Sequence, residues 1–511
     1  MVFETLLGFE LPALAIVAVA LVVILVVSSW ASPPANIPPF PARPYPILGH
    51  LVYLSKDARD VVMNWTKQTG EIFSLYMGTT LVVVLSSYDL MKDVLVKQAN
   101  IYSDRPILGL LPVLPRINGI VSTSGTLWKE NRTVVLSILR QFGMGKNVMA
   151  EKIEEEVHAY LDEVEKMDGK PADLKDLTGR AVSNVICSCV LGKRFDYNDA
   201  YYRKFLKMFD DSIEASSAAT LHVWFPQVKY LPGDFFKTKL LLKNEDAFDK
   251  FIEEMIQKVD DEDAEGINKN SIVAHYLKEM REKREKGIPT EMSEEGLWRV
   301  ITDLMTAGTE TTTTTIRWFY IYMIHNQQVQ RKVHEEIDEN VGSGRNPKIT
   351  DRPRMPYLNA AIMETQRIAS ILPFGLFHRC TEETTLRGYT IPKDTLIMPH
   401  LDAVLLSEKI WGDPLNFRPE RFIGPQGNLL NPEQLAPFSM GRRLCLGEAL
   451  AKAELFLFLA HVMHRYQVAP ESPDSLPTFD SVLGISMAPA AHNIRLVRRD
   501  GAMDHSDDHD K

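Results

Sequence analysis

Apolar residues follow a helical spacing over most of the chain, and runs with the alternation or apolar character of strands are few. The longest helical pattern covers residues 294–325, is apolar along one side, and has Ser293 placed to cap its first turn. Strand-like sequence is confined to residues 71–87, which predict a hairpin turning at Gly78, and to residues 387–399, which predict another small sheet. The pattern therefore predicts a mainly α protein with a small β portion.

The N-terminus carries an apolar run of a different kind. Residues 11–27 contain no charge, and as a helix residues 11–30 would reach about 30 Å, the thickness of a bilayer core. A cleaved signal peptide is the alternative, but the segment before the run contains Glu4 and neither lysine nor arginine. We expect an uncleaved membrane anchor. The nearest positive charge is Arg43, on the C-terminal side, which places the body of the chain in the cytosol.

The rest of the chain divides by composition. Residues 32–49 contain seven prolines, which resist both helix and sheet and favour a stiff, extended hinge. No second linker and no internal repeat follows, and the last residues are polar. The expected regions are an anchor (1–31), a proline-rich hinge (32–49), one catalytic domain (50–500) and a polar tail (501–511).

Composition and charge exclude several classes of protein. The 511 residues are 45% apolar and 24% charged, which is enough for a large core. The net charge of -10 argues against a nucleic-acid binder with a broadly basic surface. Four cysteines are too few for a disulfide framework in a chain of this length. Cys187 and Cys189 stand in an apolar stretch and are expected to be buried thiols.

The segment FSMGRRLCLG holds the strongest candidate chemistry. Cys445 lies just before a helical pattern that starts after Gly447, and free N–H groups at a helix start favour a thiolate over a thiol. Arg442 and Arg443 add positive charge. Gly441 and Gly447 permit a tight turn with the backbone close to a flat ligand. A thiolate held in this way is a metal ligand or a nucleophile.

This segment, Phe438-x-x-Gly441-x-Arg443-x-Cys445-x-Gly447, resembles the haem-binding signature of the cytochrome P450 superfamily. The resemblance spans nearly the whole chain and is closest to animal microsomal members of the drug- and steroid-metabolising type. It implies the cytochrome P450 fold with an N-terminal transmembrane helix and haem b (iron protoporphyrin IX) as cofactor. It also implies that Cys445 ligates the iron, that Phe438 shields the sulfur and that Arg443 reaches a haem propionate.

Other motifs carry the same resemblance. In the family, residues matching Glu364, Arg367 and Arg421 form a buried charge network behind the haem. The resemblance also implies four further haem contacts, at Trp128, Arg132, Arg105 and His378. Arg379 stays open as a substitute for His378. The usual proline before this histidine is Phe377 here, which leaves the local turn undetermined.

The long helical pattern contains the family's oxygen-activation motif. By resemblance, Gly308 leaves room for dioxygen, and Glu310 and Thr311 are the acid–alcohol pair that delivers protons. Threonine occupies position 309 and positions 311–315, which is unfavourable in a helix. We expect these hydroxyls to bond back to carbonyls of the preceding turn and to bend the helix.

The implied reaction is insertion of one oxygen atom into a lipophilic small molecule such as a steroid, a fatty acid or a xenobiotic. Electrons would come from NADPH through NADPH–cytochrome P450 reductase, and the resemblance also allows cytochrome b5 as a donor. The implied location is the endoplasmic reticulum membrane, with a single span and a cytosolic catalytic domain. A basic patch would suit an acidic flavoprotein; its candidates are Lys129, Arg132, Arg140, Arg442 and Lys452.

Two alternatives remain. A haem-thiolate isomerase or dehydratase would need neither reductase nor the acid–alcohol pair, and a non-catalytic haem binder would need no large apolar cavity. The apolar segments expected to line a substrate pocket are 107–114, 209–225, 372–377 and 483–487. Within them, Trp224 and Phe225 are placed to dip into a bilayer.

Overall fold

The structure is a computed structural model that describes residues 16–22, 34–54, 58–106, 119–141, 147–218, 220–230, 233–234, 237–264 and 271–499. No helix within these ranges has the length and hydropathy to cross a membrane. Residues 16–22 are helical and exposed. The other residues of the predicted anchor (1–31) and the whole predicted tail (501–511) lie outside the described residues.

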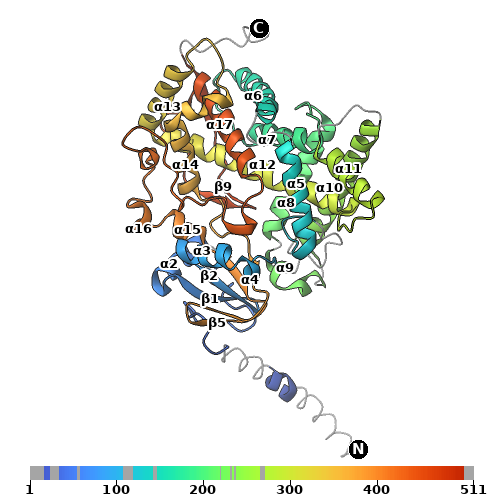
Figure 1. Ribbon diagram of the computed structural model, residues 1–511. Coiled ribbons are helices and arrows are strands. Elements are labelled where there is room, and N and C mark those ends of the chain that lie inside the picture. The colour runs from blue at the N-terminus through green and yellow to red at the C-terminus, as the bar shows by residue number, and fades with distance from the viewer. Residues whose placement is uncertain are drawn as a thin grey trace, which may run out of the picture.

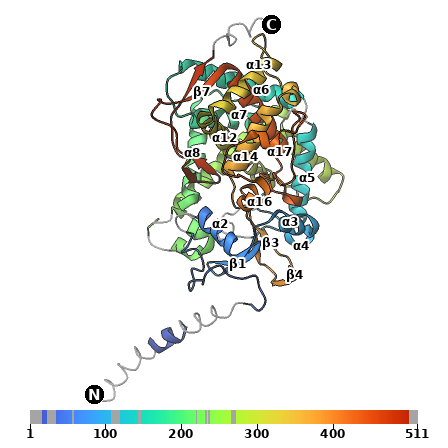
Figure 2. The ribbon, with the colours of Figure 1, turned by 90° about the vertical axis from the view of Figure 1, so that its left-hand side faces the viewer.

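Helices make up most of the body; the hairpin of residues 72–85 lies at the end nearer the N-terminus, whereas the strand of residues 466–470 lies at the opposite end (Figure 1, Figure 2). In chain order the α-helices are α2 (Ala58–Thr69), α3 (Tyr88–Lys92), α4 (Ala99–Tyr102), α5 (Gly125–Gln141), α6 (Asn147–Lys166), α7 (Lys175–Val190), α8 (Ala200–Ala218), α9 (Thr220–Trp224), α10 (Thr238–Ala264), α11 (Ile272–Glu285), α12 (Glu294–His325), α13 (Gln327–Asn340), α14 (Pro356–Ala369), α15 (Leu401–Leu405), α16 (Glu408–Trp411) and α17 (Glu448–Arg465). The predicted mainly α class is confirmed.

Helix α12 runs through the middle of the body, and its bounds match the predicted ones (Figure 1). Ser293 is the N-cap, and its hydroxyl accepts a hydrogen bond of 2.9 Å from the Gly296 N–H. The hydroxyls of Thr311 and Thr315 donate to the carbonyls of Ala307 and Thr311, at 2.7 and 2.8 Å. The expected back-bonding is therefore present at these two positions.

Helix α17 forms the second half of the main core. It contacts α6, α12, α13 and α14, and residues 455–460 are at most 1% exposed. Because this helix is apolar on nearly all sides, it is stable only inside a bundle of other helices. Packing on several neighbouring helices therefore fixes the start of α17. The residues just before the helix are held in place with it.

The main sheet has the strand order β1-β2-β6-β3. Strands β1 (Ile72–Met77) and β2 (Thr80–Leu85) form the predicted hairpin, and Gly78 lies in its turn with a φ of 62°. The prediction of one small sheet over residues 387–399 was wrong. Strand β5 (Tyr389–Ile391) pairs with β4 (Thr384–Leu386), whereas β6 (Leu396–Pro399) runs parallel to β2 and antiparallel to β3 (His378–Arg379).

The physical reason is that β6 is buried along its whole length. A fully apolar strand of this kind takes the middle of a sheet, and its partner, β2, is far away in the sequence. Two smaller sheets complete the fold: β7 (Tyr466–Pro470) with β10 (Ile494–Arg498), and β8 (Ser481–Leu483) with β9 (Met487–Pro489).

A buried charge network joins α14 to the segment that follows α16. Arg367 donates to both carboxylate oxygens of Glu364 at 2.7 and 2.9 Å, and both side chains are fully buried. Arg421 donates to Glu364 at 3.0 Å. Arg367 also donates to the carbonyls of Leu405 and Pro414, so one guanidinium holds three segments together. The structure thus brings together the three residues of the network expected from the sequence.

We predict that Arg367→Ala destabilises the fold by about 3–5 kcal/mol, because it leaves the Glu364 carboxylate buried without its main partner. The matched control is Lys332→Ala, which removes an exposed ion pair with Glu420 and should cost about 0–1 kcal/mol. Urea unfolding monitored by circular dichroism gives both values. Equal losses in the two variants would contradict the prediction.

Candidate active site

The loop before α17 presents the Cys445 sulfur. The cysteine lies three residues before the first helical residue, Glu448, and its N–H donates to the Phe438 carbonyl at 3.1 Å. Its side chain is exposed, whereas the other three cysteines are buried. Burial nevertheless raises the pKa of the thiol, against the lowering effect of the N–H groups of Gly447 and Glu448 and of the Arg132 charge. Of the four cysteines, Cys445 is therefore the one whose sulfur a ligand can reach.

Two glycines of this loop differ in what the fold demands of them. Gly441 has a φ of 76°, and a Cβ there would lie 2.0 Å from the carbonyl oxygen of Leu95. The loop is therefore pressed against the backbone of the π-helical turn Asp93–Lys97, and only glycine fits. Gly447 has a φ of -89° and no protein atom within 4 Å of a Cβ. The protein itself thus requires glycine at the first position and not at the second.

Three arginines from distant segments gather beside the cysteine. Arg105 and Arg443 are buried and Arg132 is half-buried. Burial and, to a smaller extent, the charges of Arg443 and Arg132 together lower the pKa of Arg105 to about 9. The pKa of Arg443 is lowered to about 10, chiefly by burial and also by Arg132, while the Asp104 charge acts in the opposite direction. The cations therefore repel one another in a poorly solvated place, which is unfavourable unless an anion joins them.

Hydrogen bonds to carbonyls hold these guanidinium groups in place. Arg443 donates to the carbonyls of Ser103, Ile120 and Thr123 at 2.6–3.2 Å. Arg132 donates to the Leu444 carbonyl at 2.6 Å, which ties α5 to the cysteine loop. The guanidinium of Arg443 also stacks over the Trp128 ring at 4.0 Å. Since carbonyls neutralise no charge, the cluster stays positive.

Two buried donors in the cluster have no hydrogen-bond partner within the described part of the chain. They are the indole N–H of Trp128 and the Nε–H of Arg105. Native proteins rarely leave such groups unpaired, so each one calls for an explanation. A ligand that brings carboxylates would pair both donors and neutralise the arginines. The residues present therefore fit a cofactor with acidic groups at one edge, as a haem has.

The structure separates His378 from Arg379. His378 is buried, and its Nδ1 lies 2.8 Å from the Tyr102 carbonyl oxygen. Burial and the charges of Arg105 and Arg443 lower its pKa to about 3, so this imidazole is neutral and belongs to the arginine cluster. Arg379 instead pairs with Asp104 at 3.0 Å and with Asp394 at 3.5 Å. Of the two alternatives left open by the sequence, the histidine is the one beside the cluster.

Comparisons with known proteins agree with this geometry. The sequence model of the family "Cytochrome P450" matches residues 38–496. The chain is 38% identical to human cytochrome P450 2U1, over 84% of this chain and 79% of the relative. It is 35% identical to human cytochrome P450 2J2, over 91% and 92% of the two chains, and 32% identical to cytochrome P450 18a1 of Drosophila melanogaster, over 89% and 86%.

The chain belongs to the cytochrome P450 family. The relatives are of the animal microsomal type, as the sequence predicted. The protein is accordingly a haem-thiolate monooxygenase, an oxidoreductase that uses haem iron. The positive cluster beside Cys445 has the donors that the acidic edge of a haem requires.

The segment that resembles the family's oxygen-activation motif lies at mid-length in α12. Thr311 is partly exposed, and its hydroxyl donates to the Ala307 carbonyl. For Gly308 the structure gives a reason that the sequence did not suggest. A Cβ on this residue would lie 2.6 Å from the Cδ1 atom of Ile186 on α7. The glycine therefore lets a neighbouring helix approach closely, and the expectation that it also makes room for dioxygen stays a prediction.

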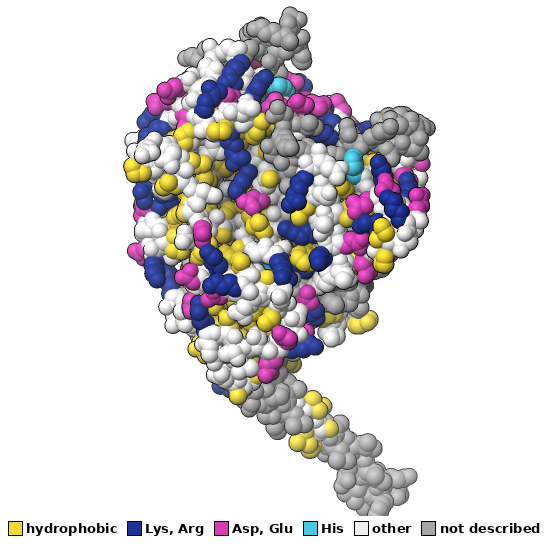
Figure 3. All heavy atoms as spheres, in the orientation of Figure 1, with side chains coloured by type: hydrophobic (Ala, Val, Ile, Leu, Met, Phe, Trp, Pro, Cys, Tyr) yellow, Lys and Arg dark blue, Asp and Glu magenta, His cyan; other side chains and the backbone are white. Residues whose placement is uncertain are grey.

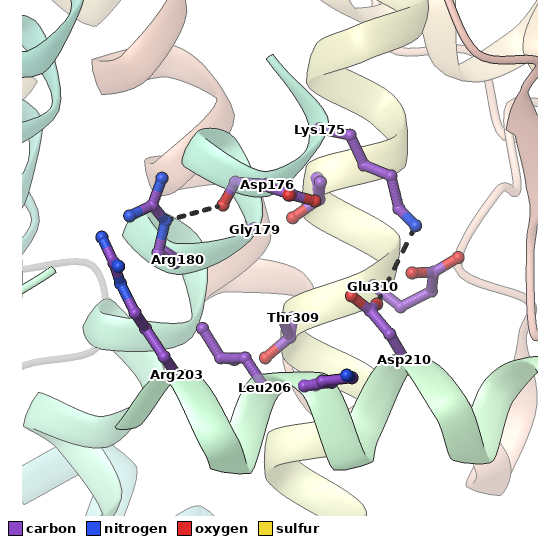
Figure 4. A pocket seen from close by; sticks show the side chains of 11 residues that line it. Lys175, Asp176, Gly179, Arg180, Arg203, Leu206, Asp210, Thr309 and Glu310 are labelled. Carbon is purple, nitrogen blue, oxygen red and sulfur yellow. Dashed lines mark hydrogen bonds and ion pairs between the residues drawn. The ribbon is translucent and has the colours of Figure 1, made fainter. Parts of the chain in front are cut away.

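Glu310 faces a polar cavity of about 410 Å³ between α7, α8 and α12, shown in Figure 4. Its carboxylate accepts a hydrogen bond of 3.0 Å from the Ser486 hydroxyl, and burial raises its pKa. An ion pair of 3.9 Å between Lys175 and Asp210 lies beside it in the same view. The charged residues around the cavity are Lys175, Asp176, Arg180, Arg203, Lys207, Asp210 and Glu310.

Sequence reasoning missed two polar residues of the site. Asp303 of α12 accepts hydrogen bonds from the N–H groups of Ile120 and Val121, at 2.6 and 2.9 Å. It thereby fixes the segment whose carbonyls hold Arg443. Ser486 reaches Glu310 from the far end of the chain. A lone aspartate in an apolar helical pattern is the only signal that could have pointed to the first, and nothing local marks the second.

The segments expected to line a substrate pocket differ in whether the structure describes them and in how exposed they are. Residues 107–114 lie outside the described residues. Trp224 and Phe225 are partly exposed: the Trp224 ring meets Phe377 edge-on at 5.8 Å, and the Phe225 ring lies against Gly78; their contact with a bilayer stays a prediction. In the segments 372–377 and 483–487, Leu376 and Leu483 are more than half exposed.

Lysine and arginine side chains are spread over the face on which α5 and α17 lie in front (Figure 1, Figure 3). Of the five candidates for a basic patch, Lys129, Arg140 and Arg442 are exposed. Lys452 pairs with Glu448 at 2.6 Å, and Arg132 is committed to the Leu444 carbonyl. Three of the five cations are thus accessible to a partner.

We predict that Gly441→Ala destabilises the protein by about 2–4 kcal/mol, because both the positive φ and the contact with Leu95 oppose a side chain. Gly179→Ala is the matched control: this glycine lies in α7, and nothing is within 4 Å of its Cβ position. The control should raise stability by about 0.5–1 kcal/mol. Denaturant midpoints measure both, and a Gly441→Ala variant as stable as the parent would refute the steric argument.

Proposed function

We propose that this cytochrome P450 binds haem b through the Cys445 thiolate and inserts one atom of dioxygen into a lipophilic small molecule. The observation that carries the proposal is the cluster of Arg105, Arg132 and Arg443 beside Cys445, with buried donors left unpaired. When bound, an iron porphyrin with a thiolate ligand supplies dioxygen activation, and the thiolate favours cleavage of the O–O bond.

The residues around the cysteine have separate tasks in this proposal. Arg443, Arg132, Arg105, Trp128 and His378 bind the two propionates, and the unpaired N–H groups of Trp128 and Arg105 donate to them. The ring of Phe438 shields the sulfur, and its carbonyl holds the Cys445 N–H. Cys445 is the metal ligand. Because the donors are already held by backbone carbonyls, little reorganisation is needed for binding.

Glu310 and Thr311 deliver protons in this proposal. Burial raises the pKa of Glu310, so its carboxyl holds a proton closer to neutral pH than an exposed glutamate does. Ser486 and the polar cavity of Figure 4 keep this carboxyl hydrated and oriented. The Thr311 hydroxyl donates a hydrogen bond to the Ala307 carbonyl. The lone pairs of its oxygen therefore stay available to accept a second hydrogen bond.

The proposed partners are those that the family resemblance implies, and the exposed cations near α5 and α17 support them. Electrons from NADPH reach the protein through NADPH–cytochrome P450 reductase, with cytochrome b5 as a second donor. The exposed cations Lys129, Arg140 and Arg442 attract the acidic surface of such a flavoprotein. The N-terminal apolar run attaches the chain to the endoplasmic reticulum membrane by a single span, with the catalytic domain in the cytosol.

Cys445→Ala is expected to abolish the thiolate-type Soret band that the reduced parent gives with carbon monoxide, because no other thiol is accessible. The control is Cys380→Ala, which removes a buried thiol elsewhere in the fold. Absorption spectra after dithionite and carbon monoxide provide the measurement. A thiolate-type band retained by Cys445→Ala would refute the ligand assignment.

Thr311→Ala is expected to keep the carbon monoxide spectrum but to lower the product formed per NADPH by about tenfold or more, with the difference released as hydrogen peroxide. Thr302→Ala is the matched control, since this hydroxyl also bonds back to its own helix, at the Trp298 carbonyl. The assay is NADPH use, peroxide and product in a reconstituted system with reductase and a panel of lipophilic compounds. Equal peroxide yields from the parent and both variants would remove Thr311 from proton delivery.

A further inference from the structure

A carboxyl group is buried in the apolar interface between α12 and α17. Glu454 is 1% exposed, and the residues that follow it in α17, Leu455 to Phe458, are buried too. Its Oε2 accepts a hydrogen bond of 3.0 Å from the Thr312 hydroxyl of α12. Its Oε1 has no hydrogen-bond partner within the described part of the chain. A buried carboxyl group with a single hydrogen bond is unusual in a helix whose other buried residues are mostly apolar.

The surroundings determine its charge. No cation contributes to the pKa of Glu454: burial raises the pKa to about 8, and the Thr312 hydroxyl is the sole opposing influence. From α7, the group that faces it is the buried thiol of Cys189. An isolated carboxylate is very costly in such a place, so the side chain is an uncharged acid at neutral pH. In this form its carboxyl can still accept the Thr312 hydrogen bond.

The hydrogen bond differs from those of the neighbouring threonines. Thr311 and Thr315 donate to carbonyls of their own helix, and Thr314 shares a hydrogen bond of 3.1 Å with the Ser486 hydroxyl, but Thr312 donates to another helix. Back-bonding of the first kind bends a helix and leaves its position undetermined. A bond across the interface fixes one turn of α12 relative to α17. That turn contains Thr311, and α17 is the helix whose start presents Cys445.

We propose that Glu454 is a positioning residue: as an uncharged acid, it holds the Thr311–Thr312 turn of α12 at a fixed place over the helix that presents Cys445. The expected effect of Glu454 on turnover, measured as hydrogen peroxide released per NADPH, rests on the proposed function. The structural part of the inference, a cross-helix bond that restrains α12, stands independently of catalysis.

The test compares four variants of the full-length protein with the parent. Glu454→Leu and Thr312→Val each remove one side of the bond. Glu454→Gln keeps an uncharged acceptor of the same shape. Thr315→Val is the matched control, because it removes a buried hydroxyl from the same helix that does not reach α17. The first readout is hydrogen–deuterium exchange of peptides that cover residues 305–318, with chemical rates subtracted. The second is hydrogen peroxide released per NADPH in the reconstituted system.

We expect Glu454→Leu and Thr312→Val to speed exchange in this segment about tenfold at pH 7, and the double variant to add little to either. Glu454→Gln and Thr315→Val should remain within about twofold of the parent. Between about pH 5 and pH 8 the exchange of the parent should rise with pH and then level off, because the carboxyl ionises in the opened segment at a lower pH than in the buried one; Glu454→Gln, which cannot ionise, should show no such rise. Peroxide release should rise in the two fast-exchanging variants alone.

Either of two results would overturn the proposal: parent-like exchange in Glu454→Leu, or the same fast exchange in Glu454→Gln as in Glu454→Leu. Identical pH profiles for the parent and Glu454→Gln would overturn the uncharged-acid part. Failure of the proposed function is recognised separately. In that case the parent would show no thiolate-type spectrum or no NADPH-dependent product, while the exchange measurements would still decide the role of Glu454.

Discussion

The turn between Gly441 and Glu448 is held from two sides, and the place of the Cys445 sulfur depends on both. On one side, the backbone at Gly441 presses on the carbonyl of Leu95, which no other residue would allow. On the other, α17 is fixed by apolar packing on its neighbours, and its first N–H groups point at the sulfur. The positive φ of 63° at Ser439 shows that the loop accepts backbone strain to reach this place. The backbone at Cys445 is thereby fixed by contacts on both sides of the turn.

The arginine cluster beside this turn works against stability. Buried cations that repel one another, together with donors that lack partners, cost free energy in the protein alone. Proteins keep such arrangements where a ligand completes them, and the ligand then stabilises the fold by binding. Backbone carbonyls and the Trp128 ring hold the guanidinium groups without neutralising them. The positive field is therefore ready before any acidic group enters.

Helix α12 combines packing and chemistry in one stretch of sequence. Gly308 admits Ile186 and so lets α7 approach closely. Glu310 turns to a polar cavity on the same side of the molecule as α7 and α8. Thr311 bonds to its own helix and Thr312 to α17. A helix built from such poor helix formers is stable only because the elements packed around it restrain it. Gly308 and Thr312 are thus poor helix formers, and they are also the residues through which the neighbouring helices position α12.

The sequence by itself determined the elements whose signals are local. The bounds of α12, the hairpin at Gly78 and a cysteine just before a helix all follow from periodicity, capping and turn residues. Tertiary structure alone decided that β6 joins β2, that His378 and not Arg379 meets the arginines, and that Asp303 and Glu454 support the site. These depend on contacts between residues far apart in the chain, where burial and mutual charge, rather than local pattern, set the energy.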